Sequence, residues 1–252
     1  MLDYDLEAAT YDQTRGGVER ARAAAGAVLE LVPDDAAVLV DVACGTGIVS
    51  ELLTAPGRVV IGVDRAAGML EPARPRLGAG RALRGDATRL PLASGAVDAV
   101  TFMWLLHLVD ARTAAAAVAE AARVLRVGGV MVTTVNKNSA SYSTASDVGD
   151  ILRTARAELA PPATDDLDAL REGAARCGLE FIGMSGYVGH GQGKTPGHWS
   201  RLVRERFSWA RNADPARIAQ VCQALEALPD QDVKRPNPVY KLAGFRLSEP
   251  RG

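Results

Sequence analysis

Residues that build metal centres, disulfide frameworks and nucleic-acid surfaces are scarce in this chain of 252 residues. It has three histidines and three cysteines, and the cysteines (Cys44, Cys177 and Cys222) are far apart. Their separation fits no metal-ligand spacing, so we expect free thiols in a reducing compartment and no metal site. The formal net charge is only −1. We therefore expect no basic surface for nucleic acid or an anionic membrane.

Long apolar runs are also missing. No stretch approaches the ~20 residues that cross a bilayer, and the first residues are acidic, without the apolar centre of a signal peptide. These features predict a cytoplasmic protein that acts on neither membranes nor nucleic acids. Hydrophobic residues still make up 48% of the chain. That is enough for a sizeable core in one α/β domain with an elaboration.

The most informative stretch joins a short apolar run to a turn of small residues. Val38–Val42 has the composition of a strand buried on both faces, and the turn Ala43 to Gly47 follows it directly. Residues 48–53 continue with helical spacing. Gly45 and Gly47 would let the backbone approach a ligand, and the first N–H groups of a helix can receive an anionic group. This predicts a nucleotide-binding βα unit, although plain tight turns share the pattern.

Strands and helices alternate along the first half of the chain. We expect strands at 38–42, 58–63, 82–84, 97–103 and 130–135, and two later ones at 179–188 and 239–247. We expect helices at 17–32, 66–70, 113–126, 147–159, 165–177, 199–210 and 215–228. The alternation predicts an α/β fold with a doubly wound, mostly parallel, seven-stranded sheet. The two late strands are expected to pair as an antiparallel edge, with the helices between them folded as a lid.

Several element ends are expected from single residues. Pro72 and Pro75 should limit the helix that begins at Ala66. Asp110 should cap the next helix, and Gly128–Gly129 should end it. We expect one domain over 1–252, with a cofactor-binding core at 36–135 and lid or substrate-binding elaborations at 136–178 and 189–238. Thr164 is expected to cap the helix at 165–177.

Polar residues follow four of the predicted parallel strands. Asp41, Asp64 and Asp86 lie at strand ends, as do the segment Phe102 to Trp104 and the residue Asn136. Right-handed crossovers place the carboxyl ends of parallel strands at one edge of a sheet, where ligands bind. A single aspartate at such a position is also typical of a turn or a cap. Several of them together predict a ligand site.

Four motifs in order now show a family resemblance: Asp41-Val-Ala-Cys-Gly45-Thr-Gly47, Gly62-Val-Asp64, Gly85-Asp86-Ala87 and Arg123-Val-Leu-Arg-Val-Gly128-Gly129. The chain resembles the class I S-adenosylmethionine (SAM) dependent methyltransferases. It is most similar to the small-molecule group whose relatives methylate quinones, sterols and secondary metabolites. The resemblance covers roughly residues 36 to 135.

The resemblance implies roles for the residues around the first two motifs. Asp41 would order the glycine turn and the methionine amino group, and Gly45 and Gly47 would lie under the methionine and ribose. Asp64 would accept hydrogen bonds from both ribose hydroxyls, as a carboxylate can. Ala43 stands where the family has its first glycine. Arg65 makes the ribose corner more basic and leaves a 2′-phosphate possible.

It also implies roles for the rest of the cofactor pocket. Met69 would pack near the adenine, Asp86 would accept from the adenine amino group, and the Ala87 N–H would reach a ring nitrogen. Phe102 and Met103 would approach the sulfonium. Tyr11 lies in a segment that similar enzymes fold over the cofactor.

The methyl acceptor is harder to read from the sequence. Methyl transfer is an in-line displacement in which the protein mainly aligns the reacting groups. His107 is the candidate general base, because an imidazole can take a proton near neutral pH, although it can equally bond a loop carbonyl. The candidate substrate-binding residues are Trp104, His107, Asn136, Tyr142, His190, His198 and Trp199. For Trp199, packing in a core or a lid is the more common role of such a residue.

Three functions remain open. The first is methyl transfer from SAM to an oxygen, nitrogen or carbon of a small molecule, with S-adenosylhomocysteine as product, by a monomer or homodimer. The second is an NAD(P)-dependent Rossmann oxidoreductase, although no tyrosine has a lysine four residues later. The third is a non-catalytic SAM-binding partner protein. Antiparallel pairing of the late strands would favour the methyltransferase over the oxidoreductase.

Overall fold

The structure is a computed structural model that describes residues 4–8, 10–160, 162–205 and 208–249. The chain divides into two compact units. Unit 1 comprises Met1–Asn136, Thr164–Tyr187 and Lys241–Gly252, and unit 2 comprises Lys137–Ala163 and Val188–Tyr240. The sequence predicts an elaboration over 136–178, but residues 164–178 belong to unit 1. The reason is that helix α8 (Leu167–Arg176) buries Leu170 and Ala174 in the core of the sheet.

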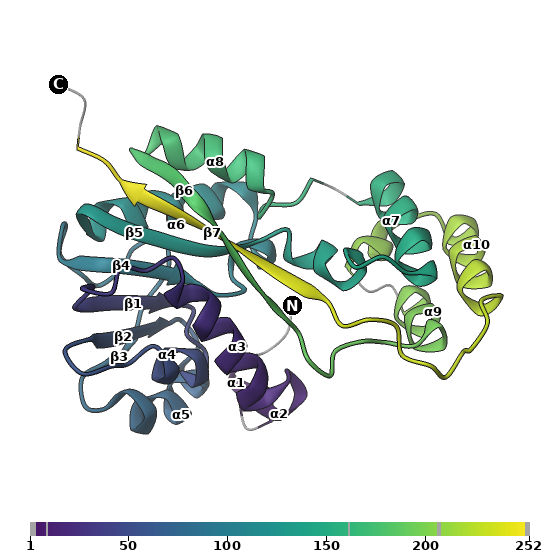
Figure 1. The fold of residues 1–252 in the computed structure, drawn as a ribbon, viewed down its shortest axis with the longest axis horizontal. Helices are drawn as coiled ribbons and strands as arrows, with labels where there is room; N and C mark the ends of the chain where they lie inside the picture. Colours follow the sequence, from purple (N-terminus) through teal and green to yellow (C-terminus); the bar gives the residue numbers. More distant parts are fainter. Residues whose placement is uncertain (1–3, 9, 161, 206–207, 250–252) are drawn as a thin grey trace. The chain divides into compact units, whose positions relative to one another are not determined.

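Unit 1 is built on the predicted doubly wound sheet (Figure 1). The strands are β1 (Val38–Val42), β2 (Val59–Asp64), β3 (Ala82–Arg84), β4 (Val97–Phe102), β5 (Leu125–Val135), β6 (Leu179–Val188) and β7 (Val239–Leu247). Their order is β3-β2-β1-β4-β5-β7-β6. The pairs from β3 through to β5 are parallel, whereas β7 runs antiparallel to β5. The antiparallel strand is thus one position in from the edge, with β6 outside it.

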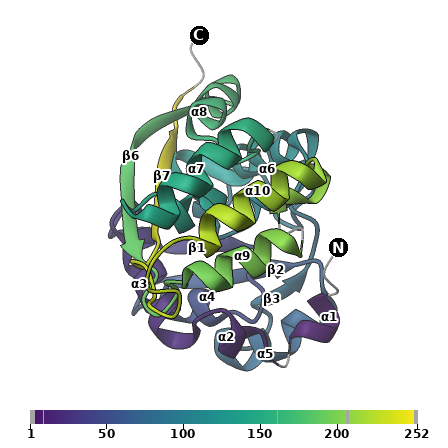
Figure 2. The same ribbon diagram turned by 90° about the vertical axis from the view of Figure 1, so that its right-hand side faces the viewer.

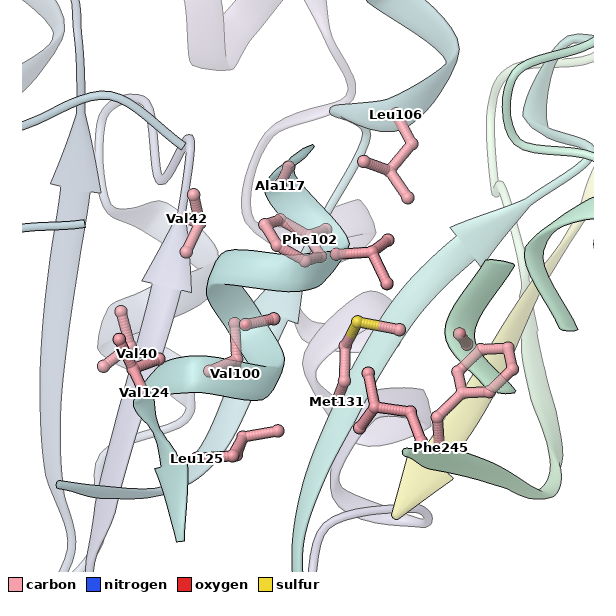
Figure 3. Close-up of a cluster of buried hydrophobic side chains, with 14 of the residues drawn as sticks. Val40, Val42, Val100, Phe102, Leu106, Ala117, Val124, Leu125, Met131 and Phe245 are labelled. Carbon is pink, nitrogen blue, oxygen red and sulfur yellow. The ribbon is translucent and has the colours of Figure 1, made fainter. Parts of the chain in front are cut away.

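The two faces of the sheet follow the two-residue period of a strand. Val40 and Val42 of β1 lie in the same apolar cluster as helix α6 (Ala111–Val124). Asp41 points to the opposite face, where its carboxylate meets Ser50 of helix α4 (Ile48–Leu52). Figure 3 shows the first cluster, with Val100 and Phe102 of β4 among its members. Helices therefore cover both faces, as a parallel sheet requires.

The remaining helices of unit 1 precede or follow these strands. They are α1 (Tyr4–Glu7), α2 (Tyr11–Thr14), α3 (Gly17–Leu29), α5 (Ala67–Leu77) and the 3-10 turn η1 (Leu106–Leu108). The prediction that prolines limit α5 is wrong, because the helix continues through both Pro72 and Pro75. Leu70, Ala73 and Leu77 lie on one face of α5 and are buried. Their burial outweighs the two backbone hydrogen bonds that the prolines cannot make.

The boundary between α6 and β5 also differs from the prediction. Asp110 caps α6 as expected, with its carboxylate accepting from the Thr113 N–H at 2.7 Å. However, α6 ends at Val124 and Gly128–Gly129 lies inside β5. A Cβ on Gly129 would lie 2.9 Å from the Asp98 carbonyl oxygen, so the strand needs glycine where its pairing with β4 is irregular.

The predicted N-cap residue of α8 is also wrong. Asp166, rather than Thr164, caps the helix by accepting from the N–H groups of Asp168 and Ala169. The Thr164 hydroxyl instead donates to the Leu106 carbonyl at 2.7 Å. This bond ties the start of the α8 segment to η1.

Unit 2 is helical. It contains η2 (Lys137–Tyr142), α7 (Asp147–Leu159), α9 (Pro196–Arg204), η3 (Ser208–Asn212) and α10 (Pro215–Glu226). Figure 2 shows α10 between α7 and α9, and it contacts both. The helix predicted at 199–210 begins earlier and ends earlier as α9, because Thr195 caps it and Pro196 suits its first turn. Tyr142, Trp199 and Trp209 belong to the apolar core of this unit.

The described residues contain neither a membrane-spanning helix nor a metal-binding cluster. None of the described helices combines the length and apolar character needed to cross a membrane. No group of three or more histidine, cysteine, aspartate or glutamate side chains within the described ranges could hold a metal ion.

Candidate functional site

The turn after β1 is held in a fixed, unusual conformation. Ala43, Gly45 and Gly47 all have positive φ angles, of 58°, 56° and 75°. The Cys44 N–H donates to the Val63 carbonyl of β2 at 3.2 Å, and the Gly45 N–H donates to Asp64 Oδ2 at 2.8 Å. Two glycines suit this backbone, but Ala43 adopts it only because the surrounding bonds impose it.

Strained residues gather at the ends of three neighbouring strands. Besides Ala43 after β1, Trp104 follows β4 with a φ of 61° and Asn136 follows β5 with a φ of 49°. In the sheet order β1, β4 and β5 are adjacent and parallel. The three residues therefore lie along one edge of the sheet. Positive φ angles in residues with a Cβ are uncommon and cluster at functional sites.

Asp64 presents a buried carboxylate at this edge. Its side chain is only 9% exposed, and its two oxygens accept backbone N–H groups of Gly45 and Ala66, at 2.8 and 2.9 Å. Burial raises the pKa of Asp64, and these amide bonds oppose the rise. Each oxygen keeps a lone pair for a further donor. The carboxylate can thus accept two hydroxyl groups of a diol.

Asp41 lies deeper, at 1% exposure. Its oxygens accept from the Ser50 hydroxyl at 2.5 Å and the Thr101 hydroxyl at 2.7 Å, so it joins β1 to α4 and β4. Burial raises the pKa of Asp41 to about 6, although the two hydroxyl groups lower it, and the nearby Asp64 raises it slightly further. Two close carboxylates make this part of the edge favourable for a cationic ligand.

Asp86 follows β3 and is exposed. Its Oδ1 accepts from both the N–H and the hydroxyl of Thr88, at 2.8 and 2.7 Å. The Thr88 hydroxyl is the main cause of the lowered pKa of Asp86. This is the geometry of a turn aspartate, and Oδ2 is the oxygen that remains for a ligand. Ala87 is half-buried beside it, packed at the margin of the sheet core.

The structure gives two of the predicted cofactor residues packing roles. A Cβ on Gly47 would lie 3.1 Å from Cβ of Ala73 in α5, so α5 as well as the positive φ requires glycine here. The Met69 sulfur lies 4.0 Å from the place where a Gly45 Cβ would stand, and the Met69 side chain is buried. Gly47 and Met69 therefore fix the turn against α5.

The Phe102 side chain belongs to the core of the sheet. The sequence predicts it near the cofactor, but its side chain is fully buried in the core beside Ala117 and Leu106 (Figure 3). Residues alternate between the faces of a strand, and Phe102 is on the α6 face. Met103 is also buried, whereas Arg65 is exposed beyond Asp64.

The N-terminal segment is bound to the turn. The Thr46 hydroxyl donates to Asp12 of α2 at 2.5 Å, and Arg76 of α5 donates both to Asp12, at 2.8 Å, and to the Thr46 carbonyl, at 2.8 Å. The Gly68 N–H of α5 donates to Asp5 of α1 at 2.6 Å. Sequence reasoning missed this network, because aspartate and arginine 64 residues apart in the chain carry no local signal.

A small cavity of about 20 Å³ adjoins the turn. Its lining residues are Tyr11, Asp12, Arg15, Gly17, Arg20, Ala21, Ile48 and Trp104. The Arg20 guanidinium is 3.8 Å from the centre of the Trp104 ring, and the indole N–H donates to the Tyr187 hydroxyl at 3.0 Å. Arg20 is only 9% exposed and also donates to the Arg15 carbonyl at 2.8 Å.

Arg20 was missed by the sequence reasoning, although a signal was present. It stands on the buried face of α3, whose other buried members are alanine and valine. A buried arginine in such a row needs a compensating interaction, because burying its charge without a partner is unfavourable. Stacking on Trp104 supplies part of that compensation.

The acceptor candidates fall in different units. Trp104, His107 and Asn136 belong to unit 1, where His107 lies half-buried on η1, and the Asn136 N–H donates to the Asp165 carbonyl at 2.8 Å. Tyr142, His190, His198 and Trp199 belong to unit 2. The rings of Tyr142 and Trp199 lie in its apolar core, which for Trp199 is the packing alternative. His190 and His198 are exposed.

The site residues fall within a stretch that matches a known family. Residues 40–133 match the model described as a methyltransferase domain. Over this stretch the chain is similar to methyltransferase domains. The matched stretch runs from β1 to β5 and so includes the turn, Asp64 and Asp86.

Curated proteins that are similar to part of this chain are named as methyltransferases. An uncharacterized methyltransferase of Mycobacterium tuberculosis is 34% identical over 48% of this chain and 49% of its own length. A malonyl-[acyl-carrier protein] O-methyltransferase of Serratia marcescens is 38% identical over 37% of this chain and 36% of its own length. The chain thus spans about half, or less, of the relatives it matches.

A solved structure shares the fold over nearly the whole chain. A chain from the complex between the Haloferax volcanii Trm112 methyltransferase activator and a methyltransferase aligns over 99% of this chain and 98% of its own. The TM-score is 0.62 at 16% identity. At that identity the likeness establishes the fold alone.

Proposed function

We propose that this protein transfers the methyl group of SAM to an oxygen, nitrogen or carbon atom of a small molecule and releases S-adenosylhomocysteine. The observation that carries the proposal is the antiparallel β7 between β5 and β6, in a sheet whose carboxyl edge presents Asp41 and Asp64. A dinucleotide-binding Rossmann sheet keeps these strands parallel in the order 3-2-1-4-5-6. The sheet therefore favours SAM over NAD(P).

The donors and charges at this edge fit SAM. Asp64 would accept the two ribose hydroxyls with its remaining lone pairs, and Asp86 would accept the adenine amino group through Oδ2. Buried Asp41 and Asp64 would favour the cationic methionine end. Arg20, beside the cavity next to Ile48, would bind the methionine carboxylate. When bound, SAM supplies an electrophilic methyl group.

The acceptor side is proposed from unit 1. Trp104 is fixed by Arg20 and Tyr187 and would form one wall of the acceptor space. His107 would take a proton from a hydroxyl or amine acceptor. The O-methyltransferase among the relatives supports a small acceptor or one carried on a protein. A cytoplasmic location and a monomeric or homodimeric state remain expectations.

Calorimetry with SAM, S-adenosylhomocysteine and NAD tests the cofactor. We expect SAM and S-adenosylhomocysteine to bind and NAD not to bind. Asp64→Asn should weaken SAM binding by about tenfold to a hundredfold, because a charge-assisted bond is lost. Asp34→Asn, at an exposed position away from the turn, is the control and should bind normally. NAD binding without SAM binding would show that the protein is an oxidoreductase.

His107→Ala tests the proposed base. We expect S-adenosylhomocysteine release to fall about a hundredfold with an acceptor found by screening, because general-base catalysis is worth that order. SAM affinity should stay within about twofold. Leu108→Ala, on the same turn but exposed, is the control. Equal release rates for His107→Ala and Leu108→Ala would remove His107 from the mechanism.

A further inference from the structure

We propose that Ser50 and Thr101 are positioning residues of the cofactor site. Their hydroxyl groups hold Asp41 as an ionised carboxylate in a fixed orientation, so that it favours the cationic methionine end of SAM. The inference deepens the proposed function and rests on it for the identity of the ligand. All three residues belong to unit 1, where they come from β1, α4 and β4.

The two hydroxyl groups reach Asp41 from different elements. β1 and β4 are parallel neighbours whose register pairs Asp41 with Thr101, so both side chains lie on the same face of the sheet. The Thr101 hydroxyl donates to Asp41 Oδ1 at 2.7 Å, and the Ser50 hydroxyl donates to Oδ2 at 2.5 Å from α4. All three residues are buried. Each carboxylate oxygen therefore has its own hydroxyl donor, and the orientation of the carboxylate is fixed from two sides.

No cation offsets the charge of Asp41 in the described part of the chain. The titratable groups that face it are Asp64 of β2 and the Cys44 thiol of the turn, and neither carries a positive charge. The groups that face it from α4 and β4 are the hydroxyls of Ser50 and Thr101. A buried carboxylate without a cation is unfavourable, and a second carboxylate nearby makes its ionisation harder.

The hydroxyl groups decide which form of Asp41 is present near neutral pH. Burial raises the pKa of Asp41 to about 6, and the Ser50 and Thr101 hydroxyls oppose that rise. A hydrogen bond donated to a carboxylate favours the ionised form, by roughly one to two pKa units for each bond. With both bonds Asp41 is ionised at neutral pH, whereas with only one it would be largely protonated there.

The charge of Asp41 is not needed to join the three elements. A protonated carboxyl could connect β1 to α4 and β4 through the same hydroxyls, because a hydroxyl can donate or accept a hydrogen bond. The charge lies two residues before the strained Ala43, at the sheet edge that also presents Asp64. Desolvated carboxylates and strained backbone gather at functional sites. A cationic ligand at this edge is therefore what the ionised form would serve.

Calorimetry of SAM binding to the full chain, between about pH 5 and 8.5 at constant ionic strength, tests the proposal. For the unmodified protein we expect the affinity to fall towards tenfold per pH unit below about pH 6. Thr101→Val and Ser50→Ala should each move this midpoint up by about one pH unit or more and bind SAM nearly normally at the alkaline end. Thr101→Ser, which keeps the hydroxyl, should restore the original midpoint.

Thr133→Val is the matched control. Thr133 is also a buried threonine, but it pairs with Phe102 on the other face of the sheet and its hydroxyl bonds to the Phe102 carbonyl. This variant should keep the midpoint of the unmodified protein. Titration of SAM itself is the same for every variant and cancels in the comparison.

The outcomes separate the two proposals. SAM binding whose pH midpoint is the same in Thr101→Val, Ser50→Ala and the unmodified protein would refute only this inference. A loss of affinity in these variants that is equal at every pH would do the same, because it would show a purely structural role. Should Thr101→Val not fold, as judged by urea unfolding, Ser50→Ala gives the same test. Absence of SAM binding by the unmodified protein at every pH would refute the proposed function, and this inference with it.

Discussion

Asp41 shows how one buried carboxylate couples the fold to pH. Its folded pKa of about 6 lies above the unfolded value of about 3.9. The native state therefore binds more protons than the unfolded state between these values. The stability linked to this group is fully present below about pH 4 and is lost as the pH rises through 6.

We predict that Asp41→Asn flattens this dependence. For the unmodified protein, two pKa units correspond to a loss of about 3 kcal/mol at most between pH 4 and 7. Urea unfolding at several pH values measures it, with Asp34→Asn as a control that should keep the native slope. If Asp41→Asn and the unmodified protein lost stability in parallel, Asp41 would not carry the effect.

At the residue scale, the sequence predicted positions better than contacts. Asp64 was predictable at the edge because it ends an apolar strand, and the structure finds it there with Gly45 bound to it. The face of the sheet on which the Phe102 ring lies was not predictable from the motif. The strand is buried on both faces, and either face accepts an aromatic ring. The contact between Arg20 and Trp104 was not predictable either, because it depends on which residue packs against α3 in the folded chain.

The glycine turn and α5 form a matched pair of elements. Gly47 has a φ of 75° and its open side meets Ala73, whereas Gly57 has a φ of 82° and nothing within 4 Å. Both glycines would suffer backbone strain on substitution by alanine, of about 1 kcal/mol. Only Gly47 would also force two helices apart.

We predict that Gly47→Ala lowers the free energy of unfolding by about 2–4 kcal/mol, and Gly57→Ala by about 1 kcal/mol. Adding Ala73→Gly to Gly47→Ala should recover part of the difference, because the contacting Cβ is removed. Urea unfolding of the four proteins measures both effects. Equal losses for Gly47→Ala and Gly57→Ala would mean that helix packing plays no part.

The element boundaries were predictable where a local signal decided them. Asp110 capped α6 as expected because the capping bond lies within one turn. The prolines of α5 misled the prediction, because the burial of Leu70, Ala73 and Leu77 is a tertiary effect. Gly128 and Gly129 misled it for the same reason, since β4 decides the register of β5.

At the scale of the whole molecule, the alternation of strands and helices predicted the sheet. It did not predict that β7 lies between β5 and β6, because strand order depends on long-range pairing. Nor did the alternation predict that the chain rejoins unit 1 at Thr164. The Thr164 hydroxyl donates to the Leu106 carbonyl there, which is a long-range contact.

The central claim is that one edge of the unit 1 sheet binds an adenosyl-sulfonium compound. A crystal structure of the protein with S-adenosylhomocysteine tests it most directly. We predict density for the ribose within hydrogen-bond distance of Asp64, for the adenine beside Asp86, and for the methionine carboxylate near Arg20. Density for the nucleoside anywhere else on the molecule, with Asp64 bonded only to Gly45 and Ala66, would contradict the account.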